Sequence, residues 1–76
     1  MIGFTQLVAT VLEVPAADVG DETGPGTHPG WTSIKHLQLI VAIEENYSLS
    51  FSREEIRSMR SIGDFRRSLA TKGVAL

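Results

Sequence analysis

The chain has 76 residues, of which 42% are hydrophobic and 21% charged, and its formal net charge is -2. These values exclude a disordered chain and predict one small globular domain spanning residues 1–76. The slightly acidic balance argues against nucleic acid as the main partner. Because the sequence contains no cysteine, it has neither disulfides nor thiolate metal sites, and we expect a cytoplasmic protein.

The sequence predicts no membrane segment and no secretory signal. Its first residues, Met1–Thr5, lack the basic start and continuous apolar run of a signal peptide. No stretch approaches the roughly 18 apolar residues that cross a bilayer as a helix. We further expect the domain to be a monomer.

Apolar residues at helical spacing predict a first helix that ends before Pro15. Its buried face would consist of Phe4, Leu7, Val8, Val11 and Leu12. A long connection rich in glycine and proline follows over residues 14–31. Connections of this length are usually functional or disordered, and we expect a loop that wraps onto the core through Val14, Val19 and Trp31.

A second helix is predicted from about Ser33 to Tyr47. Its amino end is polar, with Lys35, His36 and Gln38, and its carboxyl end carries Glu44 and Glu45. A wide apolar surface of this kind predicts a central helix that touches two or more neighbours. The surface consists of one stripe widened by two further residues, namely Ile34, Leu37, Ile40 and Val41 with Leu39 and Ile43.

Two shorter helices are predicted in the last third. Ser52 and Glu55 form a capping-box pattern, so a short helix follows with Ile56 and Met59 facing inward and Phe51 packing ahead of it. The segment 61–64 is a further helix start, with Asp64 in the first turn. Gly73 would end this last helix, whose buried face would be Ile62, Phe65 and Leu69. The fold class is therefore an all-α four-helix bundle with a long first loop and a short third helix.

Ser33 lies where the loop gives way to the second helix. A hydroxyl at this position is exposed and lies at the positive end of the helix dipole. Those are the requirements of a serine that receives a phosphate-linked group.

The second helix opens with Thr32-Ser33-Ile34-Lys35-His36-Leu37 and ends with Ile43-Glu44-Glu45, and the last helix opens with Ser61-Ile62-Gly63-Asp64. From Gly30 to Leu69 this arrangement resembles the acyl carrier protein family, which includes the peptidyl and aminoacyl carriers. That family carries Asp-Ser-Leu at the head of its second helix, a downstream Leu-Glu-Glu, and a Thr-Val-Gly-Asp-like start to its last helix.

The resemblance implies a four-helix bundle of acyl-carrier type, with Ser33 as the attachment site of 4′-phosphopantetheine. A phosphopantetheinyl transferase would attach the arm from coenzyme A with the help of magnesium. The thiol of the arm would hold an acyl or aminoacyl group as a thioester in a specialised biosynthetic pathway (secondary metabolism). A loading enzyme and a downstream synthase or transferase would be the other partners. The chain itself would be no enzyme and would bind no metal.

This sequence departs from the family at both neighbours of the serine, where Thr32 replaces the acid and Ile34 the leucine. Thr32 can still cap the helix. The expected partner-recognition residues are Trp31, Thr32, Ile34, Lys35, His36, Gln38 and Arg57. The expected acyl-pocket residues are Ile40, Ile43, Ile56 and Met59. The branched Ile56 would narrow that pocket and favour a short or polar cargo.

Several residues also allow other interpretations. His36 follows Ser33 by one turn and could serve a hydrolase as a base, but no third residue orients it, which favours a solvated or partner-facing histidine. His28 has no second metal ligand nearby. Trp31 is either a partner-facing aromatic or, as we favour, a core anchor for the loop.

The arginines of the last third form either a solvated face or a contact surface. In the first case they would pair with Glu54, Glu55 and Asp64. In the second case the chain would be a small helical protein-interaction or DNA-binding module, which is the alternative to the carrier. The residues concerned are Arg53, Arg57, Arg60, Arg66 and Arg67.

Overall fold

The computed structural model describes residues 3–74. Met1 and Ile2, on which the prediction of no signal peptide partly depends, lie outside the described residues. The chain folds into four α-helices: α1 (Phe4–Leu12), α2 (Ser33–Tyr47), α3 (Arg53–Ser58) and α4 (Ile62–Thr71). A short 3₁₀ helix, η1 (Ala16–Asp18), interrupts the first loop, and the described part of the chain contains no strand. The prediction of an all-α domain with a short third helix is confirmed.

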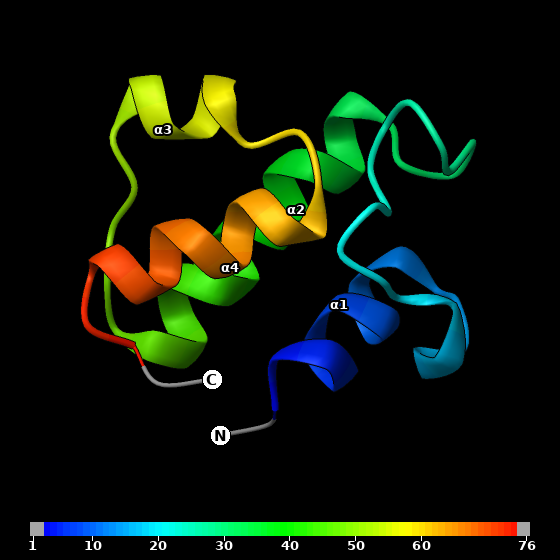
Figure 1. Cartoon of the computed structure of the whole chain (residues 1–76), viewed down its shortest axis with the longest axis horizontal. Helices are drawn as coiled ribbons and strands as arrows, with labels where there is room; N and C mark the ends of the chain where they lie inside the picture. The colour runs from blue at the N-terminus through cyan, green and yellow to red at the C-terminus, as the bar shows by residue number, and fades with distance from the viewer. Residues whose placement is uncertain (1–2, 75–76) are drawn as a thin grey trace.

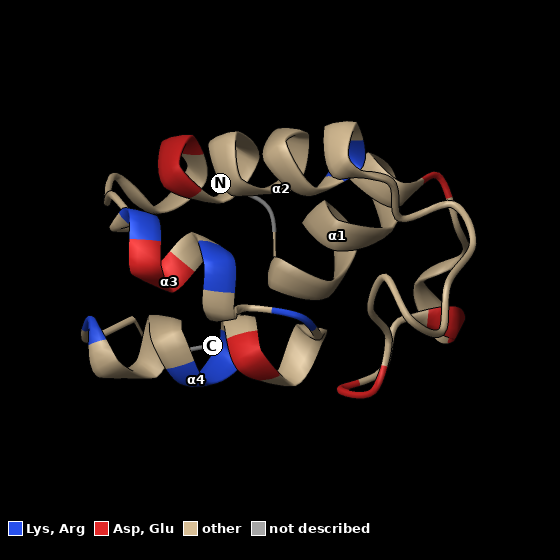
Figure 2. Cartoon of the chain, turned by 90° about the horizontal axis from the view of Figure 1, so that it is seen from above, with Lys and Arg blue, Asp and Glu red and all other residues tan. Residues whose placement is uncertain are grey.

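The helices pack around a single core. In Figure 1, α3 and α1 lie on opposite sides of the overlapping pair α2 and α4. Figure 2, seen from above, separates that pair and shows α1 and α3 between them. The loop between α1 and α2 covers the end of the molecule at which α2 begins. The start of α2 therefore lies beside the long loop.

The core combines apolar side chains from α1, α2, α4 and the loops, and Ile56 of α3 packs against it partly buried. Phe65 of α4 lies at its centre, fully buried, with its ring centroid 6.1 Å from that of Trp31 and 6.2 Å from that of Phe51. Removing this much apolar surface from water is the main stabilising contribution in a domain of this size. The other large side chains with no exposed surface are Val8, Leu39, Ile43, Ile62 and Leu69.

The buried face of α2 differs from the predicted stripe. Leu39, Ile40 and Ile43 are buried, whereas Ile34 is 69% exposed, Leu37 58% and Val41 51%. The prediction that all these residues contact neighbouring helices is therefore wrong for half of them. The three exposed residues follow one another at helical spacing and form an apolar strip on the outer side of α2.

Local hydrogen bonds explain where the helices begin and end. The Thr32 hydroxyl accepts from the Lys35 N–H at 3.2 Å at the start of α2, and the Ser61 hydroxyl accepts from the Asp64 N–H at 3.2 Å at the start of α4. Ser52 and Glu55 form the predicted capping box of α3. Gly73 follows the end of α4 with φ of +86°, a conformation that favours glycine.

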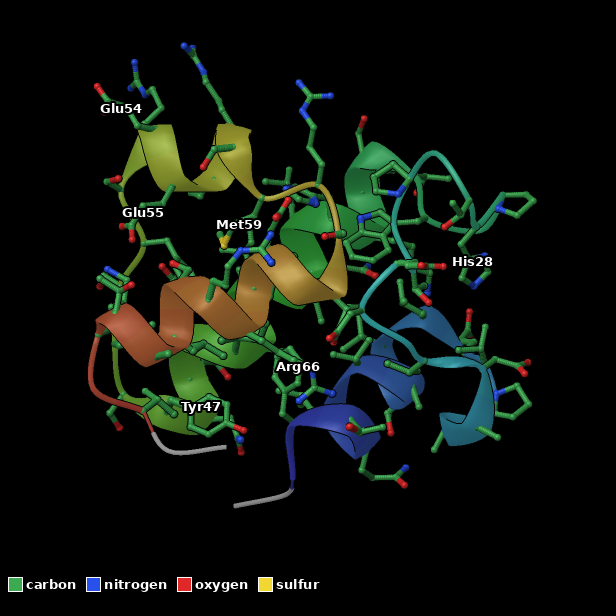
Figure 3. The ribbon with its side chains drawn as sticks, viewed as in Figure 1. His28, Tyr47, Glu54, Glu55, Met59 and Arg66 are labelled. Carbon is green, nitrogen blue, oxygen red and sulfur yellow. The ribbon has the colours of Figure 1, made fainter. Side chains whose placement is uncertain are left out.

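Met59 departs from the prediction for α3. It lies one residue beyond the helix, with extended backbone angles, and is buried all the same. Its side chain points inward from the connection between α3 and α4 (Figure 3). The third helix is therefore shorter than its apolar spacing indicates.

The long loop is a structured segment attached to the start of α4. The N–H groups of Ile62 and Gly63 donate to the carbonyl oxygens of Thr23 and Asp21, both at 2.9 Å. These bonds satisfy amides that the first turn of a helix leaves without an intrahelical partner. Trp31 is buried and Val14 and Val19 are partly buried against the core, which confirms the three predicted anchors of the loop.

Candidate functional site

Ser33 is the first residue of α2, and its side chain is exposed. Within residues 3–74 its hydroxyl makes no hydrogen bond, because the capping role belongs to Thr32. The backbone N–H groups of Ser33 and Ile34 likewise find no acceptor in that part of the chain. A free hydroxyl beside two free amides at the start of a 15-residue helix is suited to hold a phosphate group.

An open hollow of about 500 Å³ adjoins Ser33. It lies between the first turns of α2 and the segment that runs from α3 into α4. Its walls are mainly apolar, and Arg57 and Arg60 are the charged residues among those that line it. The residues that line it are Pro25, Trp31, Thr32, Ser33, His36, Leu37, Ile56, Arg57, Met59 and Arg60.

One wall of the hollow is held together by His36. The indole N–H of Trp31 donates to its Nδ1 at 3.1 Å, and its Nε2 lies 3.2 Å from the carbonyl oxygen of Ile56. Because an indole nitrogen can only donate, Nδ1 accepts, so Nε2 carries the proton and donates to Ile56. The ring thereby connects the loop, α2 and α3.

His36 therefore differs from its predicted role as a solvated or partner-facing histidine. Both of its ring nitrogens bind groups of the chain itself, and neither is directed to Ser33. A nucleophile needs a hydrogen bond to its base. The pairing of Ser33 with His36 that a hydrolase would require is not formed.

Lys35 also binds within the chain. Its Nζ lies 3.0 Å from Oε2 of Glu13 and 3.0 Å from the carbonyl oxygen of Val11, so it joins the start of α2 to the end of α1. Figure 2 shows that the ribbon of α2 carries charge at its two ends and none over its middle turns. Of the predicted recognition residues on this helix, Ile34 and Gln38 are the ones left facing solvent.

The arginines of the last third divide into two groups. Arg66 pairs with Asp21, donates to the Thr5 hydroxyl and lies 5.0 Å from the centre of the Phe4 ring, so it links α4 to α1 and to the loop (Figure 3). Arg67 pairs with Asp64. The remaining three, Arg53, Arg57 and Arg60, form no ion pair within the described residues.

Of the carboxylates that were expected to pair with arginines, Glu55 pairs with Lys72 and Asp64 with Arg67. Hydrogen bonds from the Ser52 backbone N–H and the Lys72 ammonium lower the pKa of Glu55 to about 2. The Arg60 backbone N–H, followed by the Arg67 guanidinium, lowers the pKa of Asp64 below its ordinary value. Within residues 3–74, Asp64 is therefore the one of the three expected carboxylates that pairs with an arginine, and Glu54 and Glu55 do not.

The predicted pocket residues are not all brought together. Ile56 and Met59 line the hollow, whereas Ile40 and Ile43 are buried in the core and do not reach it. Arg60 also lines the hollow, although the sequence placed it only in the alternative contact surface of arginines and not among the carrier-site residues. Its spacing of one helical turn from Arg57 was the available signal.

His28 packs within the loop. Its Nδ1 accepts from the Gly30 N–H at 3.1 Å, and its buried Nε2 has no hydrogen-bond partner among the described residues. Among residues 3–74 there is no group of three or more histidine, cysteine or acidic side chains that could hold a metal ion. No helix in the same range is long and apolar enough to cross a membrane.

Comparison with known proteins identified no family. A scan against models of protein families found none that matches this chain. A search of curated proteins found no similar sequence. The functional interpretation therefore depends on the geometry around Ser33.

Proposed function

We propose that this chain is a carrier protein of the acyl-carrier type, which holds a 4′-phosphopantetheine arm on Ser33 and presents an acyl or aminoacyl group to partner enzymes. The observation that supports the proposal most strongly is the position of Ser33. Its exposed, unbonded hydroxyl stands at the start of α2 and opens onto a hollow. The resemblance of residues 30–69 to acyl carriers agrees with this position.

The residues around Ser33 fit a phosphate-linked arm. The free N–H groups of Ser33 and Ile34, at the positive end of the helix dipole, provide donors for a phosphodiester. The apolar surfaces of Leu37, Ile56 and Met59 offer contacts to the arm and its cargo. When bound, the arm supplies the thiol chemistry, which the cysteine-free chain lacks.

Attachment of the arm is a phosphoryl-transfer reaction. The Ser33 oxygen forms a bond to the β-phosphorus of coenzyme A while the pyrophosphate bond breaks and adenosine 3′,5′-bisphosphate leaves. The hydroxyl proton passes to a base of the transferase. The chain has only to expose Ser33, and this explains why neither nitrogen of His36 is directed to it.

Partner enzymes would approach along the outer side of α2. Ile34 and Leu37 flank Ser33 and are largely exposed, and Gln38 lies on the same side. Lys35 contributes by holding α2 against α1 rather than by offering a free charge. We therefore propose that partners present an apolar surface to this helix.

The decisive experiment measures the intact mass of the chain after incubation with coenzyme A, magnesium and a broad-specificity phosphopantetheinyl transferase. We expect a gain of one phosphopantetheine unit in the parent and in Ser50→Ala, a matched control at another exposed serine. We expect no gain in Ser33→Ala.

A second variant deals with the unusual residue before Ser33. If the transferase requires the family's acid, Thr32→Asp will be modified where the parent is not. Failure of both proteins to gain mass would contradict the carrier function.

A further inference from the structure

The lysine and arginine side chains of this chain differ in whether they form ion pairs. Four of the seven lysine and arginine side chains form ion pairs, which leaves Arg53, Arg57 and Arg60 without one in the described chain. Arg57 and Arg60 both line the hollow beside Ser33, whereas Arg53 does not. The lining of the hollow therefore contains two exposed arginines and no carboxylate residue.

Nearby carboxylates do not neutralise this pair. Asp64 binds the backbone N–H of Arg60 at 2.9 Å and the side chain of Arg67. Glu55 binds Lys72 and the capping residue Ser52, and Glu54 points outward from α3, away from Met59 (Figure 3). Like charges that share one site repel each other, and an anion between them relieves that repulsion.

The chemistry of the two side chains indicates the class of ligand. Guanidinium groups bind carboxylates and phosphates through parallel N–H···O bonds. The apolar surfaces of Trp31, Ile56 and Met59 form the inner part of the same hollow. They offer contacts to the apolar part of a ligand, while the two exposed arginines offer charge. A ligand with a short apolar chain and a carboxylate or phosphate at one end matches this arrangement.

We propose that Arg57 and Arg60 form an oxyanion site that holds an anionic group presented from Ser33. The group is either the phosphodiester of the arm or a terminal carboxylate on a short cargo, as in a dicarboxylic acid bound through one end. This inference rests on the proposed carrier function and adds a substrate class to it. It also explains why a carrier would keep two unpaired arginines beside its attachment site.

The test compares four forms of the ¹⁵N-labelled chain: unmodified, arm only, butyryl-loaded and succinyl-loaded. The transferase makes the last three from coenzyme A and its two thioesters, and intact mass verifies each. Butyryl and succinyl groups have equal chain length and differ in the terminal carboxylate. The readouts are the side-chain Nε–H signals of the arginines and the thermal unfolding midpoint.

If the cargo is the anion, the Nε–H signals of Arg57 and Arg60 shift further in the succinyl form than in the butyryl form. The unfolding midpoint of the succinyl form is then higher than that of the butyryl form. If the phosphodiester is the anion, the same signals shift on addition of the arm alone and succinyl adds nothing. Either signal shift should disappear in molar salt, and the gain in unfolding midpoint should disappear in the double variant Arg57→Gln, Arg60→Gln. Arg53→Gln is the matched control and should leave both readouts unchanged.

The proposal is overturned if the signals of Arg57 and Arg60 are the same in all four forms. If Ser33 cannot be modified, the carrier function fails separately, and the site is tested by titrating the unmodified chain with inorganic phosphate. Phosphate should then shift Arg57 and Arg60 but not Arg53, and the absence of a selective shift would refute the site. Binding of duplex DNA that shifts all three arginines alike would instead favour the DNA-binding alternative.

Discussion

The indole N–H of Trp31 and Nδ1 of His36 are joined by a 3.1 Å hydrogen bond, and the opposite nitrogen of the ring reaches the carbonyl oxygen of Ile56 at 3.2 Å. These two hydrogen bonds connect the loop before Ser33 to α3 on the other side of the hollow. They fix the shape of one wall of the hollow through a neutral imidazole. The candidate site therefore depends on a residue that performs no chemistry itself.

The first prediction concerns this connection. His36→Phe keeps a flat ring but leaves the Trp31 N–H and the Ile56 carbonyl without partners, so we expect a loss of about 1–3 kcal/mol in the free energy of unfolding. Urea unfolding followed by circular dichroism measures it. Trp31→Phe removes the donor alone, and the double variant should lose less than the sum of the two single losses. Additive losses would contradict the bond.

The second prediction concerns the contact between the loop and the start of α4. A Cβ atom built on Gly24 would lie 2.1 Å from the carbonyl oxygen of Arg60, so one of the two backbone segments must move. Gly24→Ala should therefore lower the free energy of unfolding by about 1–3 kcal/mol or more.

Gly26→Ala is the matched control for that variant, because nothing lies within 4 Å of its added Cβ. It should leave stability unchanged or raise it by up to about 1 kcal/mol through the unfolded chain. Equal midpoints for the two variants in urea unfolding would show that the loop does not contact α4 as described.

The third prediction concerns the acid sensitivity of Glu55. Its pKa is lowered from 4.5 to about 2 by the Ser52 N–H and the Lys72 ammonium, so the folded state favours the ionised form. The resulting stabilisation is complete above pH 4.5 and is lost as the pH falls toward 2. Glu55→Gln should be less stable than the parent at neutral pH, with a difference that narrows over this interval.

The measurement is urea unfolding across the acid range, together with an NMR titration of the Glu55 side chain. Glu54→Gln serves as the control, because Glu54 forms no ion pair in residues 3–74. A Glu55 titration at its ordinary value would contradict the role of the Ser52 and Lys72 bonds.

The helices were predictable because local chemistry determines their ends. Ser52 with Glu55 and Ser61 with Asp64 form hydrogen bonds within one turn, so a short stretch of sequence contains all the information needed. Ser33 was likewise predictable as an exposed residue at a helix start. The partners of His36 were not, because the Ile56 carbonyl is 20 residues away and reaches the ring through packing.

The buried face of α2 could not be predicted for a related reason. Apolar residues occur on nearly every side of this helix, so their spacing does not distinguish the side that faces the core. Packing in the shared core makes that choice, burying Leu39 and Ile43 and exposing Leu37 and Val41. The ion pairs of Arg66 and Lys35 are also set by packing, since their partners lie on the first helix and its loop.

The fourth prediction tests this choice of face. Val41 is 51% exposed and Leu39 is fully buried, although the two are separated by a single residue. Val41→Gln should change the free energy of unfolding by less than about 0.5 kcal/mol, whereas Leu39→Ala should lower it by about 2–5 kcal/mol. Urea unfolding measures both. A large loss in Val41→Gln would mean that a second copy covers this side of α2 in solution, and sedimentation would then show a dimer where we expect a monomer.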